Sequence, residues 1–302
     1  MLLDLDKSIL VKENEPLSAH SSFKIGGNVN MAIFPQNKEQ LISALRSVKA
    51  ANIKFQVIGN GSNLLFADEG YDGAIIFTKY VNATAITIID GDTYIKAECG
   101  KSLTELANEA GKKRSLTGLE FAYGIPATIG GAIFMNSGAY GGQMSDIVVE
   151  TEYYNINSDE VVTVKAEEQK FSYRHTLFME HPEYIILSTT LKLKAGVQNE
   201  ILEIMSKNMT SRKDKQPLEY PSAGSVFKRP GEGIFAGKLI EDSKLKGFSI
   251  GGAEISEKHA GFIVNKGGAT AADVLEVIKH TQKTVLANFG IQLECEIIYI
   301  PK

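Results

Sequence analysis

The sequence has few of the features that mark disulfide-rich, membrane-spanning or nucleic-acid-binding proteins. Its two cysteines, Cys99 and Cys295, are too few for a disulfide framework or a zinc site, and we expect both to be buried free thiols in a reducing compartment. No stretch approaches the ~18 consecutive apolar residues of a membrane span. The N-terminal segment MLLDLDKSIL lacks the basic start and the apolar run of a signal peptide. A net charge of -4 offers little attraction to a polyanion.

These absences favour a cytoplasmic globular protein that neither enters a membrane nor binds nucleic acid. Apolar residues make up 43% of the chain and charged residues 23%, which is ordinary for a folded protein. One hydrophobic core usually stops growing at roughly 250–300 residues, so a chain of this length predicts two or three domains. None of the five histidines has the spacing of metal ligands, and we expect no metal site.

Helix and strand signals alternate along the chain from about residue 37. A helix is predicted after Asn37, with Gln40 as its capping partner, and another between Ser102 and Gly111, which is placed to end it. The glycine-rich stretch 118–142 reads as ordered loop with a short helical turn near 130–135. Apolar periodicity predicts further strands at 55–58, 74–77, 85–89, 147–165, 184–194 and 291–300, and helices at 195–217, 234–246 and 270–289.

Two loops have the composition that binds anions through backbone N–H groups, namely Gly59–Asn63 and Gly124–Gly131. The first is not a Rossmann fingerprint, because Leu64 occupies the place of the third glycine. The segment 231–238 is not a P-loop, since its glycine spacing is wrong and Leu239 replaces the magnesium-binding hydroxyl. Two such loops without either pattern favour a dinucleotide bound by a different fold.

Six motifs then occur in order along the chain: His20–Gly27 (HSSFKIGG), Val57–Leu65 (VIGNGSNLL), Gly118–Gly131 (GLEFAYGIPATIGG), Asn136–Gly141 (NSGAYG), Phe171–Arg174 (FSYR) and Ala223–Pro230 (AGSVFKRP). Together they resemble the UDP-N-acetylenolpyruvoylglucosamine reductases, which are flavoenzymes of peptidoglycan precursor synthesis. The resemblance covers nearly the whole chain. No long insertion follows Tyr173, which is similar to the shorter, type II form of the family.

The resemblance implies an α+β fold with an FAD-binding region of the vanillyl-alcohol-oxidase (PCMH) type. This region would occupy residues 1–205 as two subdomains divided near residue 78, and a substrate-binding domain with a closing C-terminal strand would occupy 206–302. It also implies non-covalent FAD, NADPH as electron donor and a nucleotide-sugar substrate. The expected protein is a monomer or weak oligomer that serves cell-wall biogenesis, and through it cell shape and division.

The implied reaction reduces an enol ether that carries a carboxylate. It needs a cation on the carboxylate, an acid beside the developing enolate and a proton donor over the carbanion carbon. The resemblance assigns the first role to Arg174, the proton to Ser225 and the remaining carboxylate to Glu296. Glu294 would share a strand face with Glu296, so either glutamate could be the active one.

The binding residues that the resemblance implies lie in the glycine loops and around the last two motifs. For FAD they are Gly59, Asn60, Gly61, Ser62, Asn63, Gly124, Ile125, Ala127, Gly131, Ser137, Gly138 and Arg212. For the substrate they are Tyr173, Lys215, Gln216, Lys228 and Arg229. If residues 226–229 are extended, Arg229 would share the face of Ser225 roughly 13 Å further on, within reach of a diphosphate.

Two other functions fit parts of the pattern. An oxidase of the same fold, acting on a small alcohol or sugar, would share the first 200 residues but lack the Ala223–Lys228 motif and the final glutamate. A non-catalytic nucleotide-sugar binding protein would share the substrate residues but would be colourless when purified.

Overall fold

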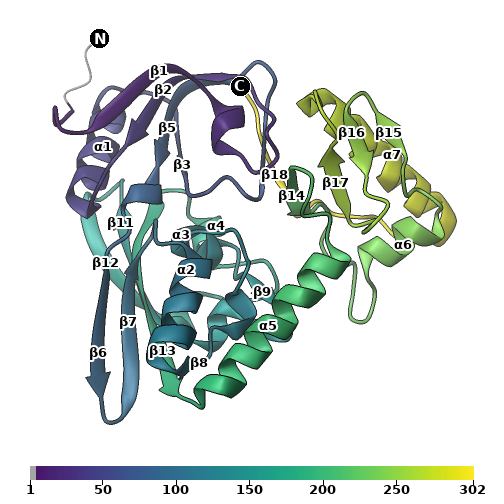
Figure 1. Cartoon of the computed structure of the whole chain (residues 1–302). Helices are drawn as coiled ribbons and strands as arrows, with labels where there is room; N and C mark the ends of the chain where they lie inside the picture. Colours follow the sequence, from purple (N-terminus) through teal and green to yellow (C-terminus); the bar gives the residue numbers. More distant parts are fainter. Residues whose placement is uncertain (1–4) are drawn as a thin grey trace. The chain divides into compact units, whose positions relative to one another are not determined.

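The computed structural model describes residues 5–302, which form two compact units (Figure 1). Unit 1 contains the described residues up to Lys12, together with Met31–Asn60 and Gly73–Ser211. Unit 2 contains Glu13–Asn30, Gly61–Asp72 and Arg212–Lys302. The segment MLLD, part of the stretch that argued against a signal peptide, lies outside the described residues. The domain boundary near residue 205 and the subdivision near 78 stay predictions.

The chain contains both helices and strands, and its six-stranded sheet and one of its four-stranded sheets are antiparallel, as is typical of the α+β class. The helices are α1 (Lys38–Ala50), α2 (Leu103–Asn108), α3 (Ile129–Phe134), α4 (Leu177–Glu180), α5 (Gln198–Lys215), α6 (Ala236–Asp242) and α7 (Ala271–Phe289). The longer strands are β1 (Leu10–Pro16), β2 (Asn28–Phe34), β5 (Tyr71–Phe77), β6 (Thr84–Ile89), β7 (Asp92–Glu98), β11 (Val148–Asn155), β12 (Glu160–Lys165) and β13 (Tyr184–Ala195). The shorter strands are β3 (Phe55–Ile58), β4 (Leu64–Phe66), β8 (Leu116–Thr117), β9 (Gly138–Ala139), β10 (Gly142–Gln143), β14 (Ser222–Ser225), β15 (Ser249–Ile250), β16 (Ala253–Ile255), β17 (Phe262–Asn265) and β18 (Ile298–Ile300).

The largest sheet of unit 1 is antiparallel, with the order β12-β11-β13-β7-β6 and β8 paired to β13. Its central strand β13 is rich in β-branched and leucine side chains, and Leu187 and Leu191 have no exposed surface. A second sheet has the order β1-β2-β5-β3, and β1, β2 and β5 each run across the division between the units along the chain. Helix α3 contacts β13 and β7, which sets the glycine-rich segment on a rigid base.

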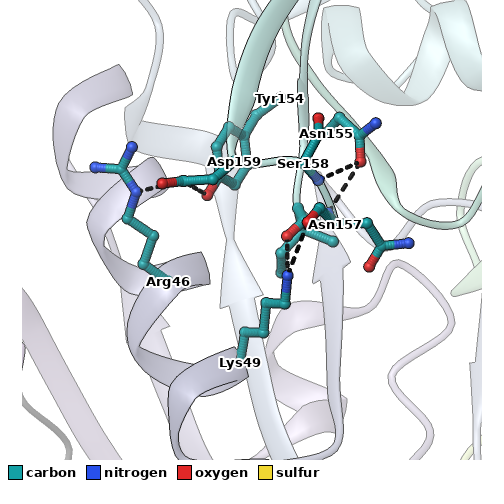
Figure 2. Close-up of polar contacts among 8 residues, drawn as sticks. Arg46, Lys49, Tyr154, Asn155, Asn157, Ser158 and Asp159 are labelled. Atoms are coloured by element: carbon teal, nitrogen blue, oxygen red, sulfur yellow. Dashed lines mark hydrogen bonds and ion pairs between the residues drawn. The ribbon is translucent and has the colours of Figure 1, made fainter.

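Polar contacts fasten α1 to the turn between β11 and β12 (Figure 2). Arg46 pairs with Asp159 at 2.6 Å, and the Tyr154 hydroxyl donates to the same carboxylate. The Lys49 ammonium donates to the carbonyls of Ile156 and Asn157. Because Arg46 and Asp159 are both more than half exposed, the pair adds about 1 kcal/mol at most, and its main effect is on orientation.

Unit 2 has its own core around the sheet β14-β17-β16-β15 and the long helix α7. The capping prediction for α7 is confirmed, because Thr270 and Asp273 cap each other's backbone and Gly290 ends the helix at φ +67°. The Asp68 carboxylate accepts two further N–H groups from the first turn of α7, at 2.7 and 3.0 Å. A parallel pair, β18 with β4, joins the C-terminal segment to the strand that follows the first glycine loop.

Three local predictions are wrong. Gly111 does not end a helix, since it lies in a π-helical turn over Glu109–Lys113, where a Cβ would lie 2.8 Å from Met205 of α5. The closing strand, predicted over residues 291–300, is Ile298–Ile300 alone, and Cys295 forms only an isolated bridge with Phe227. Cys295 is exposed, because that isolated bridge does not place it in a continuous sheet, whereas Cys99 is buried as expected.

Candidate active site

The two glycine loops meet in unit 1. A Cβ on Gly59 would lie 2.2 Å from the Thr128 hydroxyl, so the backbone there approaches the second loop too closely for any side chain. The Asn60 amide donates to the Pro126 carbonyl at 3.2 Å. Thr128 is the N-cap of α3 and accepts the Gly131 N–H at 3.4 Å. Two loops joined by a contact between residues 66 positions apart thus lie side by side in unit 1.

Helix α2 holds the second loop in place. The Thr104 hydroxyl donates to the Ile125 carbonyl at 2.8 Å and accepts the Gly124 N–H at 3.1 Å, while Leu103 N–H donates to Ala127 O at 2.9 Å. Gly131, by contrast, is exposed, and a Cβ there would meet nothing closer than 3.6 Å. The loop is therefore rigid and leaves backbone accessible, which is what a pyrophosphate requires.

The remainder of the first loop, Gly61–Asn63, belongs to unit 2. Gly61 has φ +61°, and a Cβ on it would lie 2.4 Å from the His20 carbonyl. The Asn63 amide donates to the Glu296 carbonyl at 3.0 Å, and the Asn63 carbonyl accepts the Ile298 N–H at 2.9 Å. A predicted cofactor residue thus holds the backbone of a predicted catalytic residue that is 233 positions away.

Ser225 and Glu296 lie on segments that pair with each other in unit 2. Glu296 N–H donates to the carbonyl of Val226, the residue after Ser225, at 2.7 Å, and Lys228 N–H donates to Glu294 O at 2.9 Å. A bulge in β14, between the pairs Ser222–Val264 and Ser225–Phe262, interrupts the pleat at Ser225. The alternation of a regular strand therefore does not decide where Ser225 points.

The two C-terminal glutamates have different surroundings. The Glu294 side chain is 75% exposed and pairs with Lys228 at 3.6 Å, which is a surface ion pair. Glu296 is half-buried, and hydrogen bonds from Asn63 and to Val226 fix its backbone. This contrast favours Glu296 as the residue with a defined position.

The Tyr173-Arg174 pair forms the tip of a two-residue hairpin in unit 1. Ser172 and His175 exchange backbone hydrogen bonds of 3.1 and 3.3 Å on either side of it. Arg174 has φ +55°, a left-handed conformation that costs a residue with a side chain about 1–2 kcal/mol. Its guanidinium lies 5.0 Å from the centre of the Tyr173 ring. Strain of this kind gathers at functional sites, where the surrounding structure must hold it.

The other predicted binding residues of unit 2 are in varied surroundings. Arg212 is a buried cation, 9% exposed, and its Nη1 donates to Gln216 Oε1 at 3.1 Å, whereas Lys215 is exposed. Arg229 is exposed and stacks over the Phe235 ring at 5.2 Å. Residues 226–229 form one antiparallel bridge, Phe227 with Cys295, and no named strand, so the position of Arg229 about 13 Å from Ser225 stays a prediction.

Two residues with defined contacts, Asn136 and Ser22, were given no role from the sequence, and His259, expected to line a pocket rather than bind a ligand, is partly buried. Asn136 is 1% exposed and bonded to the Tyr173-Arg174 hairpin. The Ser22 hydroxyl donates to the carbonyl of Ser222 in β14 at 2.7 Å. Burial lowers the pKa of His259, whose Nδ1 accepts the Gly261 N–H at 3.1 Å. Asn136 and Ser22 stand inside recognised motifs, so their place in a motif was the one signal available.

Comparison with known proteins defines the class first. A family profile described as FAD binding domain matches residues 29–165, which include Gly59–Asn63 and Gly124–Gly131. A second, described as UDP-N-acetylenolpyruvoylglucosamine reductase, C-terminal domain, matches residues 216–300. The residues present in unit 1 fit FAD, because hydrogen bonds from Asn60 and Thr104 fix the two glycine loops while Gly131 leaves backbone open. The fold and the loops define a flavin-binding oxidoreductase of the α+β class, as expected.

Full-length relatives narrow this class to one family. The UDP-N-acetylenolpyruvoylglucosamine reductase of Caldanaerobacter subterraneus subsp. tengcongensis is 45% identical over 301 residues, covering 98% of this chain and 97% of the relative. That of Clostridium perfringens (strain SM101 / Type A) is 43% identical over 284 residues, covering 94% and 91%. The crystal structure of UDP-N-acetylenolpyruvylglucosamine reductase from Thermus caldophilus superposes with a TM-score of 0.77 at 32% identity, covering 97% of this chain and 99% of that one. The chain belongs to the UDP-N-acetylenolpyruvoylglucosamine reductase family, which confirms the resemblance.

Within residues 5–302, no helix is both long and apolar enough to cross a bilayer.

Proposed function

We propose that the chain reduces the enolpyruvyl ether of UDP-N-acetylglucosamine-enolpyruvate to UDP-N-acetylmuramate, a step of peptidoglycan precursor synthesis, with NADPH as the electron source. When bound, FAD accepts electrons from NADPH and supplies the hydride to the terminal vinyl carbon. Membership of the family is the observation that carries the proposal. The pairing of the Ser225 and Glu296 segments in unit 2 supports it.

Arg174 binds the carboxylate of the enolpyruvyl group. A guanidinium binds a carboxylate through two parallel hydrogen bonds and stays charged at every relevant pH. As hydride arrives, negative charge develops on the adjacent carbon and spreads into that carboxylate, so the cation stabilises the transition state more than the ground state. The hairpin that presents Arg174 is already formed in the structure, which reduces the ordering that substrate binding must bring about.

Ser225 donates the proton to the carbanion carbon. A serine hydroxyl is a weak acid, but the carbanion is a strong base and a fixed geometry makes the transfer feasible. Glu296 stabilises the developing enolate by hydrogen bonding. The half-burial of Glu296, against the exposed ion pair of Glu294, supports this choice between the two glutamates.

The substrate's nucleotide end is anchored by cations and polar groups outside the reacting centre. Lys228 and Arg229 follow Ser225 in the same motif, after two apolar residues. Arg229 stacks on Phe235, which keeps the guanidinium over an aromatic surface while its edge stays exposed. Lys215 and Gln216, at the end of α5, and Tyr173 complete the proposed set. A cytoplasmic location and a monomeric or weakly oligomeric state go with this function.

The experiment that tests the function separates its two half-reactions under anaerobic conditions. The purified protein should carry FAD and should be bleached by NADPH. Addition of UDP-N-acetylglucosamine-enolpyruvate should then restore the oxidised flavin spectrum with one equivalent of product. A flavin that NADPH reduces but that the enolpyruvyl nucleotide-sugar does not reoxidise would refute the proposed substrate. A colourless protein that cannot be reconstituted with FAD would favour a binding protein instead.

A further inference from the structure

Asn136 is the buried polar side chain that connects the Asn136–Gly141 motif to the Tyr173-Arg174 hairpin. It is 1% exposed, and its own backbone is left-handed, at φ +42°. Its Nδ2 donates to the Ser172 carbonyl at 3.0 Å, and its Oδ1 accepts the Ser145 N–H at 3.0 Å. A weaker contact of 3.4 Å joins Nδ2 to Gln143 Oε1. Both ends of the amide are therefore used, each by backbone of a different segment.

The Ser172 carbonyl, which accepts the hydrogen bond from Asn136, also takes part in closing the hairpin. The Ser172 carbonyl also accepts the His175 N–H at 3.3 Å, so one oxygen receives the hydrogen bond that closes the turn and the bond from Asn136. Arg174 lies between these groups in a left-handed conformation, which a residue with a side chain keeps only when its surroundings impose it. Loss of the Asn136 bond would therefore release the turn whose geometry aims the guanidinium.

A second contact holds the far end of the same hairpin. The Thr176 hydroxyl, which is fully buried, donates to the Phe134 carbonyl at 2.9 Å, at the end of α3 and two residues before Asn136. Residues at and just after the C-terminal end of α3 thus form hydrogen bonds with both sides of the hairpin, at Ser172 and at Thr176. Ser137 and Gly138, predicted to contact FAD, follow Asn136 directly. The segment 134–138 therefore contains two predicted FAD residues and also holds the hairpin that presents Arg174.

We propose that Asn136 is a positioning residue for Arg174: its amide fixes the Tyr173-Arg174 hairpin so that the guanidinium meets the substrate carboxylate without rearrangement. The proposal rests on the proposed function, because it deepens the role given to Arg174. Because Asn136 is buried and both ends of its amide bond to protein backbone, we assign it no contact with the substrate or the reacting atoms. Its effect should therefore fall on the substrate half-reaction and pass entirely through Arg174.

Two variants test this role, with a matched control. Asn136→Asp keeps the shape and the acceptor for Ser145 but replaces the donor to Ser172 with an acceptor, and aspartate tolerates a left-handed backbone. Asn136→Gly removes the side chain without backbone strain, in case the buried charge of Asn136→Asp prevents folding. Gln143→Leu is the control, because it deletes the weaker contact of the same amide and leaves the Ser172 bond intact.

We expect both Asn136 variants to bind FAD and to be reduced by NADPH within about twofold of the unsubstituted protein. The enolpyruvyl nucleotide-sugar concentration that half-saturates flavin reoxidation should rise by about 10–100-fold, the cost of misplacing a binding group by roughly 1 Å. Gln143→Leu should leave that concentration unchanged. In an Arg174→Ala background, Asn136→Asp should add less than about twofold, because both substitutions remove the same interaction.

Three results would overturn the proposal: no change in reoxidation by either Asn136 variant, equal slowing of both half-reactions, or a full multiplicative effect on top of Arg174→Ala. The last two would make Asn136 a structural residue of the unit as a whole. Failure of the proposed function would look different, because the unsubstituted protein itself would not be reoxidised by the enolpyruvyl nucleotide-sugar, and the role given to Asn136 would then fall with it.

Discussion

Gly131→Ala should stabilise the protein without cofactor while weakening its hold on FAD. In the structure a Cβ at this position would have its nearest neighbour 3.6 Å away, at the Thr128 hydroxyl, which is an ordinary van der Waals contact. Gly131 is the third residue of α3, where alanine is favoured over glycine by about 0.5–1 kcal/mol. The apoprotein should therefore melt about 1–2 °C higher, because an entropy of unfolding of about 2.1 cal/mol/K per residue gives a shift of about 1.6 °C per kcal/mol for 302 residues.

FAD affinity should change in the opposite direction. If the pyrophosphate rests on the exposed backbone of Gly131, the added methyl group occupies the space that the ligand needs, and we expect the FAD dissociation constant to rise at least about tenfold, or 1.4 kcal/mol. The assay is titration of apoprotein with FAD, followed by flavin fluorescence, next to a melting curve of the same apoprotein. Opposite signs in the two measurements distinguish a lost ligand contact from a damaged fold.

Gly231→Ala is the matched control, because its Cβ would also meet nothing closer than 3.6 Å, at Ile234, and it lies outside both glycine loops. It should leave FAD affinity unchanged. Gly59 and Gly61 cannot replace Gly131 in this test. A Cβ on Gly59 would lie 2.2 Å from Thr128 and a Cβ on Gly61 2.4 Å from the His20 carbonyl, so a substitution there would distort the loop itself. An unchanged FAD affinity in Gly131→Ala would refute the assignment of this backbone to the cofactor site.

The remaining predictions concern protons and thiols. Ser225→Ala should keep FAD and its reduction by NADPH but slow reoxidation by the substrate about 10²–10⁴-fold, and equal slowing of both steps would indicate a structural role instead. Glu296→Gln should slow the same step, whereas Glu294→Gln should leave it within about twofold, because the Glu294–Lys228 pair is a surface contact worth about 1 kcal/mol at most; the reverse result would exchange the two assignments. Burial raises the pKa of Cys99 to about 12, so the folded state disfavours the thiolate. The free energy of unfolding should therefore fall as pH rises from the ordinary thiol pKa toward 12, because over that range only the unfolded chain releases the proton. At pH 8.5 an alkylating reagent should label one thiol of the native protein, that of Cys295, and two after unfolding, whereas rapid labelling of both in the native protein would contradict the burial of Cys99.

The secondary structure that was predicted correctly is encoded over short distances. Helix α7 begins at Thr270 and ends at Gly290 because a capping box and a left-handed glycine act within one turn of their own residues. Helix α1 likewise begins after Asn37, whose side chain accepts the Gln40 N–H at 2.9 Å. The prediction at Gly111 was wrong because the reason for that glycine is remote: α5 packs against it.

The short strands around Ser225 were missed for a similar reason. The sequence Ser222–Ser225 has too few residues and too much glycine for a periodic signal, and its bulge is defined only by the register with β17. The extended conformation predicted for residues 226–229 assumed a regular pleat, which that bulge and the bend at Val226 interrupt. No local pattern specifies an irregularity that depends on the neighbouring strand.

By itself the sequence determined the class of protein and the family, because six ordered motifs and two glycine loops can be recognised from residue types along the chain. It also predicted which residues form the site. Only the tertiary structure decided which of them are neighbours: Asn63 with Glu296, 233 residues apart, and Asn136 with Ser172, 36 residues apart. Capping and periodicity act within a turn or a strand and can be read along the chain, whereas hydrogen bonds between distant segments exist only once the packing of the core has brought those segments together.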